Sequence, residues 1–168
     1  LLGGTPPRHH RDIAHVLQAT AVNDRVPVTV REVVGLARSA GRPWRRLRPD
    51  DREAVDRALT RVDVTDLAGR HLGELSGGQR QRVLIAQGLA QEAPVLLLDE
   101  PMAALDVAQV ARVEEAIREE AAAGTAVVWT THDLHTALQA DRVVLLAGRV
   151  VGFGTPEEVM THELLAEA

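Results

Sequence analysis

The chain has 168 residues, of which 45% are hydrophobic and 26% are charged, a composition that suits one globular domain with its own core. Its formal net charge of −5 gives no general reason to expect nucleic-acid binding, and the absence of cysteine excludes a disulfide scaffold and a thiolate metal site. No apolar run approaches the roughly 18–20 residues that cross a bilayer, so work at a membrane would require docking onto another subunit.

The first half of the chain predicts one strand followed by helices. The apolar segment Ile13–Leu17 predicts a short strand, and Gln18 follows it directly. Thr29 is the expected N-cap of a helix, because apolar residues recur behind it at helical spacing. After a proline-containing loop, Asp50 or Asp51 is expected to cap a second helix.

The second half of the chain predicts alternating strands and helices. The predicted strands are 95–98, 125–130 and a hairpin of 143–146 with 150–153. The predicted helices are 76–90, 107–123, 133–140 and a short one that begins at Pro156. The run Val95–Leu98 is apolar throughout, which suits a strand covered on both faces, as in a parallel sheet. This alternation predicts an α/β layered core.

The most specific motif is the string LSGGQRQR at residues 75–82, where a predicted helix begins. A serine and two glycines at a helix start can bind an anion, because the first-turn N–H groups point outward at the positive end of the helix dipole. For Ser-Gly-Gly alone, the alternative is an N-cap after a flexible turn. The full string resembles the signature motif of ABC (ATP-binding cassette) ATPases. The resemblance implies that Ser76, Gly77, Gly78 and Gln79 contact the nucleotide.

A second motif is the acidic pair Asp99-Glu100 that ends the apolar run. This pattern places two carboxylates at the carboxyl edge of a sheet, where open α/β folds bind their ligands. One carboxylate can hold Mg²⁺, while its neighbour orients or deprotonates a water. For the pair alone, the alternative is an acidic turn after a core strand. The segment resembles the Walker B motif of the same family, which implies Asp99 on magnesium and Glu100 as the catalytic base.

Three shorter matches follow the order of the family's motifs. Residues 102–106, ending in Asp106, resemble the D-loop, which crosses the dimer interface. Residues 130–133 resemble the switch region, in which His132 would contact the γ-phosphate and help position the attacking water. Gln18 resembles the Q-loop glutamine, which reaches magnesium and water and senses the transmembrane subunit. Each match alone has an ordinary alternative, but their order supports all three.

The chain departs from the family at the phosphate-binding Walker A loop, which ends in Gly-Lys-Ser/Thr. All 19 basic residues are arginine, so that lysine has no counterpart. The segment Gly3-Gly4-Thr5 is no substitute, because two prolines without N–H groups follow it. The missing loop and the start at Leu1 indicate an N-terminally truncated cassette. This chain alone is therefore expected to be inactive toward ATP.

The resemblance implies a P-loop NTPase-like ABC core with a mostly parallel sheet, an inserted helical subdomain and missing N-terminal strands. Residues 1–18 would form core with the Q-loop, 19–92 the helical subdomain with the signature, and 93–168 core with the remaining motifs. The implied activity of the full-length protein is ATP hydrolysis with ATP and Mg²⁺ as cofactors, coupled to transport.

The resemblance also implies partners and a location. Two cassettes would close head to tail around two ATP molecules, each on an integral-membrane permease, with a substrate-binding protein as an indirect partner and no nucleic acid. The subunit would be cytoplasmic and peripheral on the inner face of the plasma membrane. The stretch 26–34 and the later Arg-Arg-Leu-Arg-Pro most resemble the zinc/manganese-importer branch, with iron-siderophore importers as close competitors. Import of a divalent metal or metal chelate is the resulting expectation.

Two other classes of function stay open at this point. One is a soluble ABC ATPase of translation or DNA repair, although such proteins usually carry two cassettes or long insertions. The other is a non-catalytic module that kept the fold and lost the ATP site. Against the second class, Gln18, Asp99, Glu100 and His132 are all present, and a dead site has no physical reason to retain them together.

Overall fold

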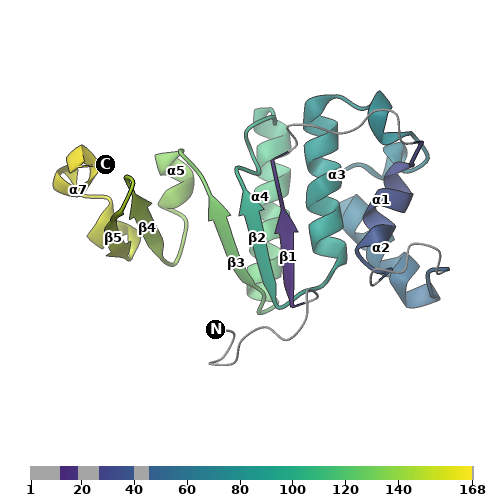
Figure 1. The fold of residues 1–168 in the computed structure, drawn as a ribbon, viewed down its shortest axis with the longest axis horizontal. Helices are drawn as coiled ribbons and strands as arrows, with labels where there is room; N and C mark the ends of the chain where they lie inside the picture. The colour runs from purple at the N-terminus through teal and green to yellow at the C-terminus, as the bar shows by residue number, and fades with distance from the viewer. Residues whose placement is uncertain (1–11, 19–26, 40–45, 168) are drawn as a thin grey trace. The chain divides into compact units, whose positions relative to one another are not determined.

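The structure is a computed structural model that describes residues 12–18, 27–39 and 46–167. The chain divides into two compact units, residues 1–130 and 131–168 (Figure 1). In the described ranges no helix has both the length and the apolar character to span a membrane. The segment Gly3-Gly4-Thr5 and part of the stretch used for the importer branch lie outside the described residues.

The first unit holds a three-stranded sheet and the long helices. Its strands are β1 (Ile13–Val16), β2 (Val95–Asp99) and β3 (Ala126–Thr130). Its helices are α1 (Val30–Leu36), α2 (Pro49–Arg61), α3 (Gly77–Ala90) and α4 (Val107–Ala122), with 3₁₀ turns at Thr65–Leu67 and Leu72–Glu74. The strands lie in the order β1-β2-β3 and are all parallel, which confirms the predicted α/β core. Helix α4 ends before Gly124, whose φ of 98° suits a residue without a side chain.

The sheet register brings the carboxyl ends of the three strands to one edge. Val16 of β1 pairs with Leu98 of β2, and Leu98 pairs with Trp129 of β3. Asp99, the last residue of β2, pairs with Thr130, the last residue of β3. β2 and β3 therefore end at the same level of the sheet, and β1 ends one residue earlier.

The second unit contains short elements around one hairpin. These are α5 (Leu134–Ala137), β4 (Val143–Leu146), β5 (Val150–Gly154), α6 (Pro156–Val159) and α7 (His162–Glu167). β4 and β5 are antiparallel and turn at Gly148, as predicted. The predicted helix 133–140 was too long. Its last residues form a tighter turn, in which Gln139 and Ala140 donate their N–H groups to carbonyls three residues back.

Two helix starts show how local chemistry decides a boundary. Thr29 caps α1 as predicted, in a reciprocal arrangement with Glu32. The predicted cap of α2 was wrong, because Arg48 occupies the cap position and Pro49 begins the helix. Proline suits the first turn, since its missing N–H would have no partner there. Asp51 contributes instead from inside the helix, by accepting the Arg48 N–H at 3.1 Å.

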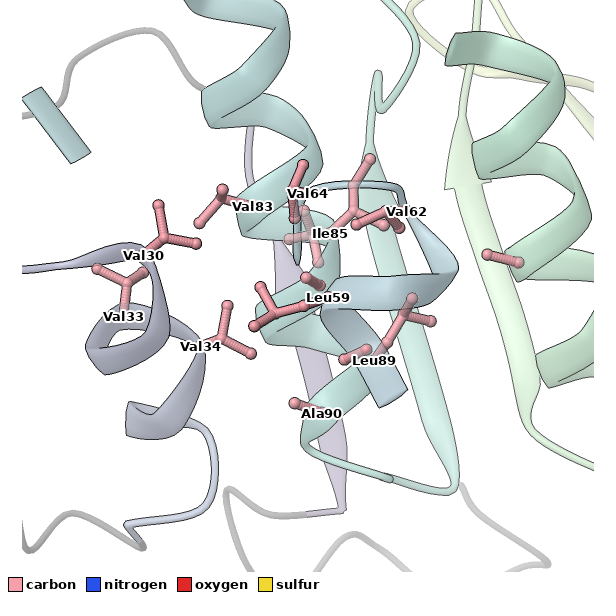
Figure 2. Close-up of a cluster of buried hydrophobic side chains, with 14 of the residues drawn as sticks. Val30, Val33, Val34, Leu59, Val62, Val64, Val83, Ile85, Leu89 and Ala90 are labelled. Carbon is pink, nitrogen blue, oxygen red and sulfur yellow. The ribbon is translucent and has the colours of Figure 1, made fainter. Parts of the chain in front are cut away.

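The core of the first unit lies where α1, α2 and α3 pack together and α3 covers β1 (Figure 2). Leu59 of α2 and Ile85 of α3 have no exposed surface. Gly88 of α3 allows close approach to the sheet, because a Cβ there would lie 2.5 Å from a methyl carbon of Val16. Helix α3 therefore links the other two helices to the sheet, because it packs against α1 and α2 as well as against β1.

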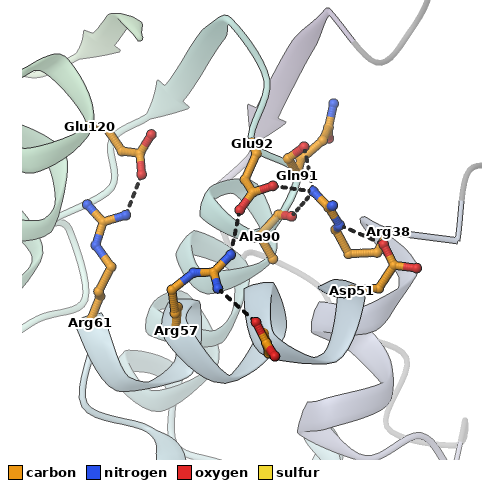
Figure 3. Close-up of polar contacts among 9 residues, drawn as sticks. Arg38, Asp51, Arg57, Arg61, Ala90, Gln91, Glu92 and Glu120 are labelled. Atoms are coloured by element: carbon orange, nitrogen blue, oxygen red, sulfur yellow. Dashed lines mark hydrogen bonds and ion pairs between the residues drawn. The ribbon is translucent and has the colours of Figure 1, made fainter. Parts of the chain in front are cut away.

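Charged side chains join the ends of the three helices (Figure 3). Arg38, just beyond α1, donates to Asp51 of α2 at 3.2 Å and to Glu92 at 2.7 Å. It also donates to the Ala90 carbonyl at 3.2 Å, so it satisfies an acceptor at the end of α3. Arg57 of α2 reaches the same Glu92 at 3.0 Å. Residues far apart in sequence thus hold α1, α2 and the end of α3 together.

A third arginine, Arg61, joins α2 to α4. Arg61 donates from Nε to Glu119 at 2.9 Å and pairs with Glu120, as Figure 3 shows for the latter. Glu120 also accepts the hydroxyl of Thr125 at 3.0 Å, directly before β3. The helix that carries Arg61 is therefore anchored to the strand layer through side chains as well as through the apolar core.

Candidate functional site

Three predicted site residues share the carboxyl edge of the parallel sheet. Val16 of β1 pairs with Leu98 of β2. Gln18 lies two residues beyond Val16, and Glu100 lies two residues beyond Leu98. Asp99 is the last residue of β2 and directly precedes Glu100. Gln18 is exposed, whereas Asp99 and Glu100 are half-buried. The structure thus brings an amide and two carboxylates to the edge where open α/β folds bind ligands.

The two carboxylate residues are joined by the side chain of Thr130, at the end of the neighbouring strand. The Thr130 hydroxyl donates to Oδ1 of Asp99 at 2.6 Å and accepts the backbone N–H of Glu100 at 3.0 Å. Glu100 has a φ of 42°, in the left-handed region that residues with a side chain seldom adopt. A rare backbone conformation at a sheet edge is typical of functional sites.

The sequence motif included Thr130 but assigned it no role. Its position becomes informative only in the structure, because two neighbouring parallel strands that end at the same level place their last residues side by side. A hydroxyl beside a carboxylate at such positions can form a charge-assisted hydrogen bond. That inference requires the register, which the sequence does not specify.

The residues at this edge fit magnesium bound together with a nucleotide. Mg²⁺ typically takes one or two protein carboxylates and completes its shell with water and phosphate oxygens. Asp99 offers one carboxylate, and its hydrogen bond with Thr130 involves Oδ1 alone, leaving Oδ2 for a metal. Within ranges 12–18, 27–39 and 46–167, no group of three or more histidine or acidic side chains forms a metal cage. A magnesium ion that shares its shell with phosphate oxygens and water needs few protein ligands, and Asp99 can supply one of them.

The signature residues form the start of α3. The Ser76 hydroxyl accepts the Gln79 N–H at 3.3 Å, and the Gln79 amide oxygen accepts the Ser76 N–H at 3.0 Å. This reciprocal cap leaves the N–H groups of Gly77 and Gly78 without acceptors among the residues that the structure describes. Unpaired donors at the positive end of a helix dipole suit an anionic ligand.

The two signature glycines lie in different surroundings. A Cβ on Gly78 would lie 2.7 Å from the Ala104 carbonyl oxygen and 3.1 Å from Oε1 of Gln109. A Cβ on Gly77 would meet nothing within 4 Å. Asp106, the predicted D-loop residue, caps α4 by accepting the Gln109 N–H at 2.9 Å. The signature and the D-loop segment are therefore in direct contact through Gly78.

This contrast predicts different effects for the two glycine-to-alanine substitutions. Gly78→Ala is expected to lower the free energy of unfolding by about 1–3 kcal/mol, because the added methyl group must displace backbone. Gly77→Ala is expected to leave it unchanged or raise it by up to about 1 kcal/mol, since alanine is the better helix former. Urea unfolding of both variants measures this. Equal destabilisation by both would contradict the packing described for Gly78.

His132 belongs to the second unit, where it directly precedes the cap of α5. Asp133 caps that helix by accepting the N–H of His135 at 3.1 Å and the hydroxyl of Thr136 at 2.7 Å. The Thr136 hydroxyl, and then the His135 N–H, lower the pKa of Asp133, so its carboxylate stays charged as a helix cap. The role of His132 at the nucleotide stays a prediction.

Comparison with known proteins identifies relatives along most of the chain. A family model described as ABC transporter matches residues 4–103. The hemin import ATP-binding protein HmuV of Streptomyces coelicolor is 47% identical over 145 residues, which are 84% of this chain and 51% of that protein. The manganese transport system ATP-binding protein MntB of Halalkalibacterium halodurans is 36% identical over 163 residues, 95% of this chain and 65% of that protein.

Solved structures of an ABC transporter and of an ATP-binding cassette have the same fold as this chain. A metal-chelate type ABC transporter in an inward-facing conformation matches with a TM-score of 0.79 and 31% identity, over 93% of this chain and 63% of that one. The dimeric ATP-binding cassette MJ0796 bound to ADP and Pi matches with a TM-score of 0.74 and 29% identity, over 87% of this chain and 64% of that one. The chain spans about half the length of its hemin import relative. It belongs to the ABC transporter family.

Proposed function

We propose that the whole protein is the ATP-hydrolysing subunit of an ABC importer. The observation that carries this proposal is the edge shared by Gln18, Asp99 and Glu100, with the last two joined through Thr130. The start of α3 supports it independently, because the N–H groups of Gly77 and Gly78 suit a phosphate. Both features use residues that the family resemblance assigns to ATP.

In the proposed reaction, water attacks the γ-phosphorus of ATP. The bond between that phosphorus and the oxygen bridging the β- and γ-phosphates breaks. Glu100 accepts the proton of that water, and His132 contacts the γ-phosphate and helps position the water. Magnesium, when bound with ATP, supplies charge neutralisation on the phosphates, and Asp99 and Gln18 are the residues that would hold it. The protein's own contribution is positioning and electrostatic stabilisation.

The proposed assembly is a head-to-tail pair of such subunits. Ser76 to Gln79 of one subunit would contact the γ-phosphate held by its partner, while Asp106 would lie at the interface. The relative solved as a dimer with ADP and Pi supports the pairing of two subunits. The pair would bind an integral-membrane permease from the cytoplasmic side, and a substrate-binding protein would act through that permease.

The proposed cargo is a metal ion or a metal chelate. Relatives named for hemin import and manganese transport support this class, as does the relative described as a metal-chelate type transporter. The hemin relative has the higher identity, at 47% against 36% for the manganese relative, so a chelate is as well supported as a free divalent ion.

Magnesium-dependent binding of labelled ATP tests the proposal. We would compare the 168-residue chain with the product of the whole gene. Binding and hydrolysis by the whole-gene product alone is the expected result, because the lysine-bearing loop is absent from the present chain. No binding by either protein would overturn the proposal and favour a non-catalytic module. Tight binding by the 168-residue chain would show that the loop is not required.

A further inference from the structure

We propose that Thr130 is a positioning residue that holds the metal-binding carboxylate and the catalytic glutamate in one arrangement. The inference rests on the proposed function, since it concerns the same site. Thr130 lies on β3, whereas Asp99 is the last residue of β2 and Glu100 directly follows it. The coupling therefore crosses from one strand to the next.

The hydrogen bonds of Thr130 give its hydroxyl a defined direction. A hydroxyl has one hydrogen to donate, and here it goes to Oδ1 of Asp99 at 2.6 Å. An oxygen lone pair accepts the Glu100 N–H at 3.0 Å. Because the donor bond ends on a carboxylate, it is of the stronger, charge-assisted kind. A single oxygen thus contacts both residues on which the proposed chemistry depends.

Each contact restricts the group that it reaches. The bond to Oδ1 limits rotation of the Asp99 carboxylate, so that Oδ2 is presented in one orientation. The bond from the Glu100 N–H supports a backbone with a φ of 42°, which a residue with a side chain seldom adopts. Partners that orient a metal ligand in this way typically matter 10–100-fold for metal affinity or activity.

The alternative is that Thr130 serves only the strand. Valine distinguishes the two roles, because it has the shape of threonine and the same preference for strands but lacks the hydroxyl. Thr130 is exposed, so its hydroxyl is not needed to satisfy a buried group. A structural role predicts that Thr130→Val behaves like the parent protein. A positioning role predicts that only Thr130→Ser does.

The first experiment measures the hydrogen bond on the 168-residue chain, without nucleotide. We expect the Glu100 amide to exchange about tenfold faster or more in Thr130→Val, and at the parent rate in Thr130→Ser. Thr125→Val is the matched control, because its hydroxyl bonds to Glu120 and should not affect Glu100. Unchanged exchange in Thr130→Val would overturn the inference.

The second experiment measures the consequence in the whole-gene product. Thr130→Val is expected to lower kcat about tenfold or more with a smaller change in KM for ATP, while Thr130→Ser stays within about threefold of the parent. With Mn²⁺ in place of Mg²⁺, electron paramagnetic resonance should show metal affinity in the ATP complex about tenfold weaker for Thr130→Val. If the parent is active and Thr130→Val matches it in both kcat and metal affinity, the inference is overturned while the proposed function stands. A parent without ATPase activity would overturn the proposed function as well.

Discussion

Glu100→Gln is expected to lower kcat for ATP hydrolysis by the whole-gene product about 10²–10⁴-fold, the usual contribution of a general base. The carboxamide keeps the shape of the side chain but cannot accept the proton of the attacking water. ATP binding does not use that step, so it should survive. The bound state should then persist, and the proposed head-to-tail dimer should accumulate.

Steady-state hydrolysis and size-exclusion chromatography with ATP and Mg²⁺ measure both parts of this expectation. Glu163→Gln is a matched control, because it makes the same chemical change at an exposed residue of α7. The control should hydrolyse ATP at the parent rate and elute as the parent does. Parent-level hydrolysis by Glu100→Gln would show that another group accepts the proton.

Leu59→Ala is expected to lower the free energy of unfolding by about 2–5 kcal/mol, the range for deleting a buried leucine side chain. Leu59 has no exposed surface and lies in the cluster formed by α1, α2 and α3 (Figure 2). The substitution removes its buried methyl groups and leaves a cavity that the surrounding helices fill only in part. The first unit should therefore lose a large share of its stability.

Urea unfolding of the 168-residue chain checks this value against Leu36→Ala. Leu36 ends α1 and is 46% exposed, so the same truncation there should cost about 0.5 kcal/mol or less. A small effect of Leu59→Ala, equal to that of Leu36→Ala, would mean that the helical cluster is not the stabilising core.

Strongly patterned elements were predictable because their signals are local. The apolar run before Asp99 became β2, and the Ser-Gly-Gly string became the capped start of α3. Gly124 ended α4, since a residue without a side chain readily takes its positive φ. In each case one short segment contains both the element and its boundary.

Predictions were less accurate where several local choices were possible. The start of α2 offered two aspartates as caps, yet the backbone begins the helix at Pro49 and Asp51 bonds backward. The helix after Asp133 ended early, because its last N–H groups bond three residues back. Caps and last turns depend on small energy differences that sequence patterns do not resolve.

The sequence by itself determined the chemistry available to this protein. It contains the two carboxylates, the glutamine, the histidine and the serine-glycine helix start, in an order that resembles ABC ATPases and without the lysine of their phosphate loop. These features are residue types and spacings, which are known from the sequence without a three-dimensional structure.

Only the tertiary structure decided which of these groups meet. Strand register placed Thr130 beside Asp99, and helix packing placed Gly78 against Ala104. Both contacts join segments separated in sequence, and the pairing of strands depends on the whole set of packed side chains. The link that one hydroxyl makes between the Asp99 carboxylate and the Glu100 backbone is therefore a property of the fold.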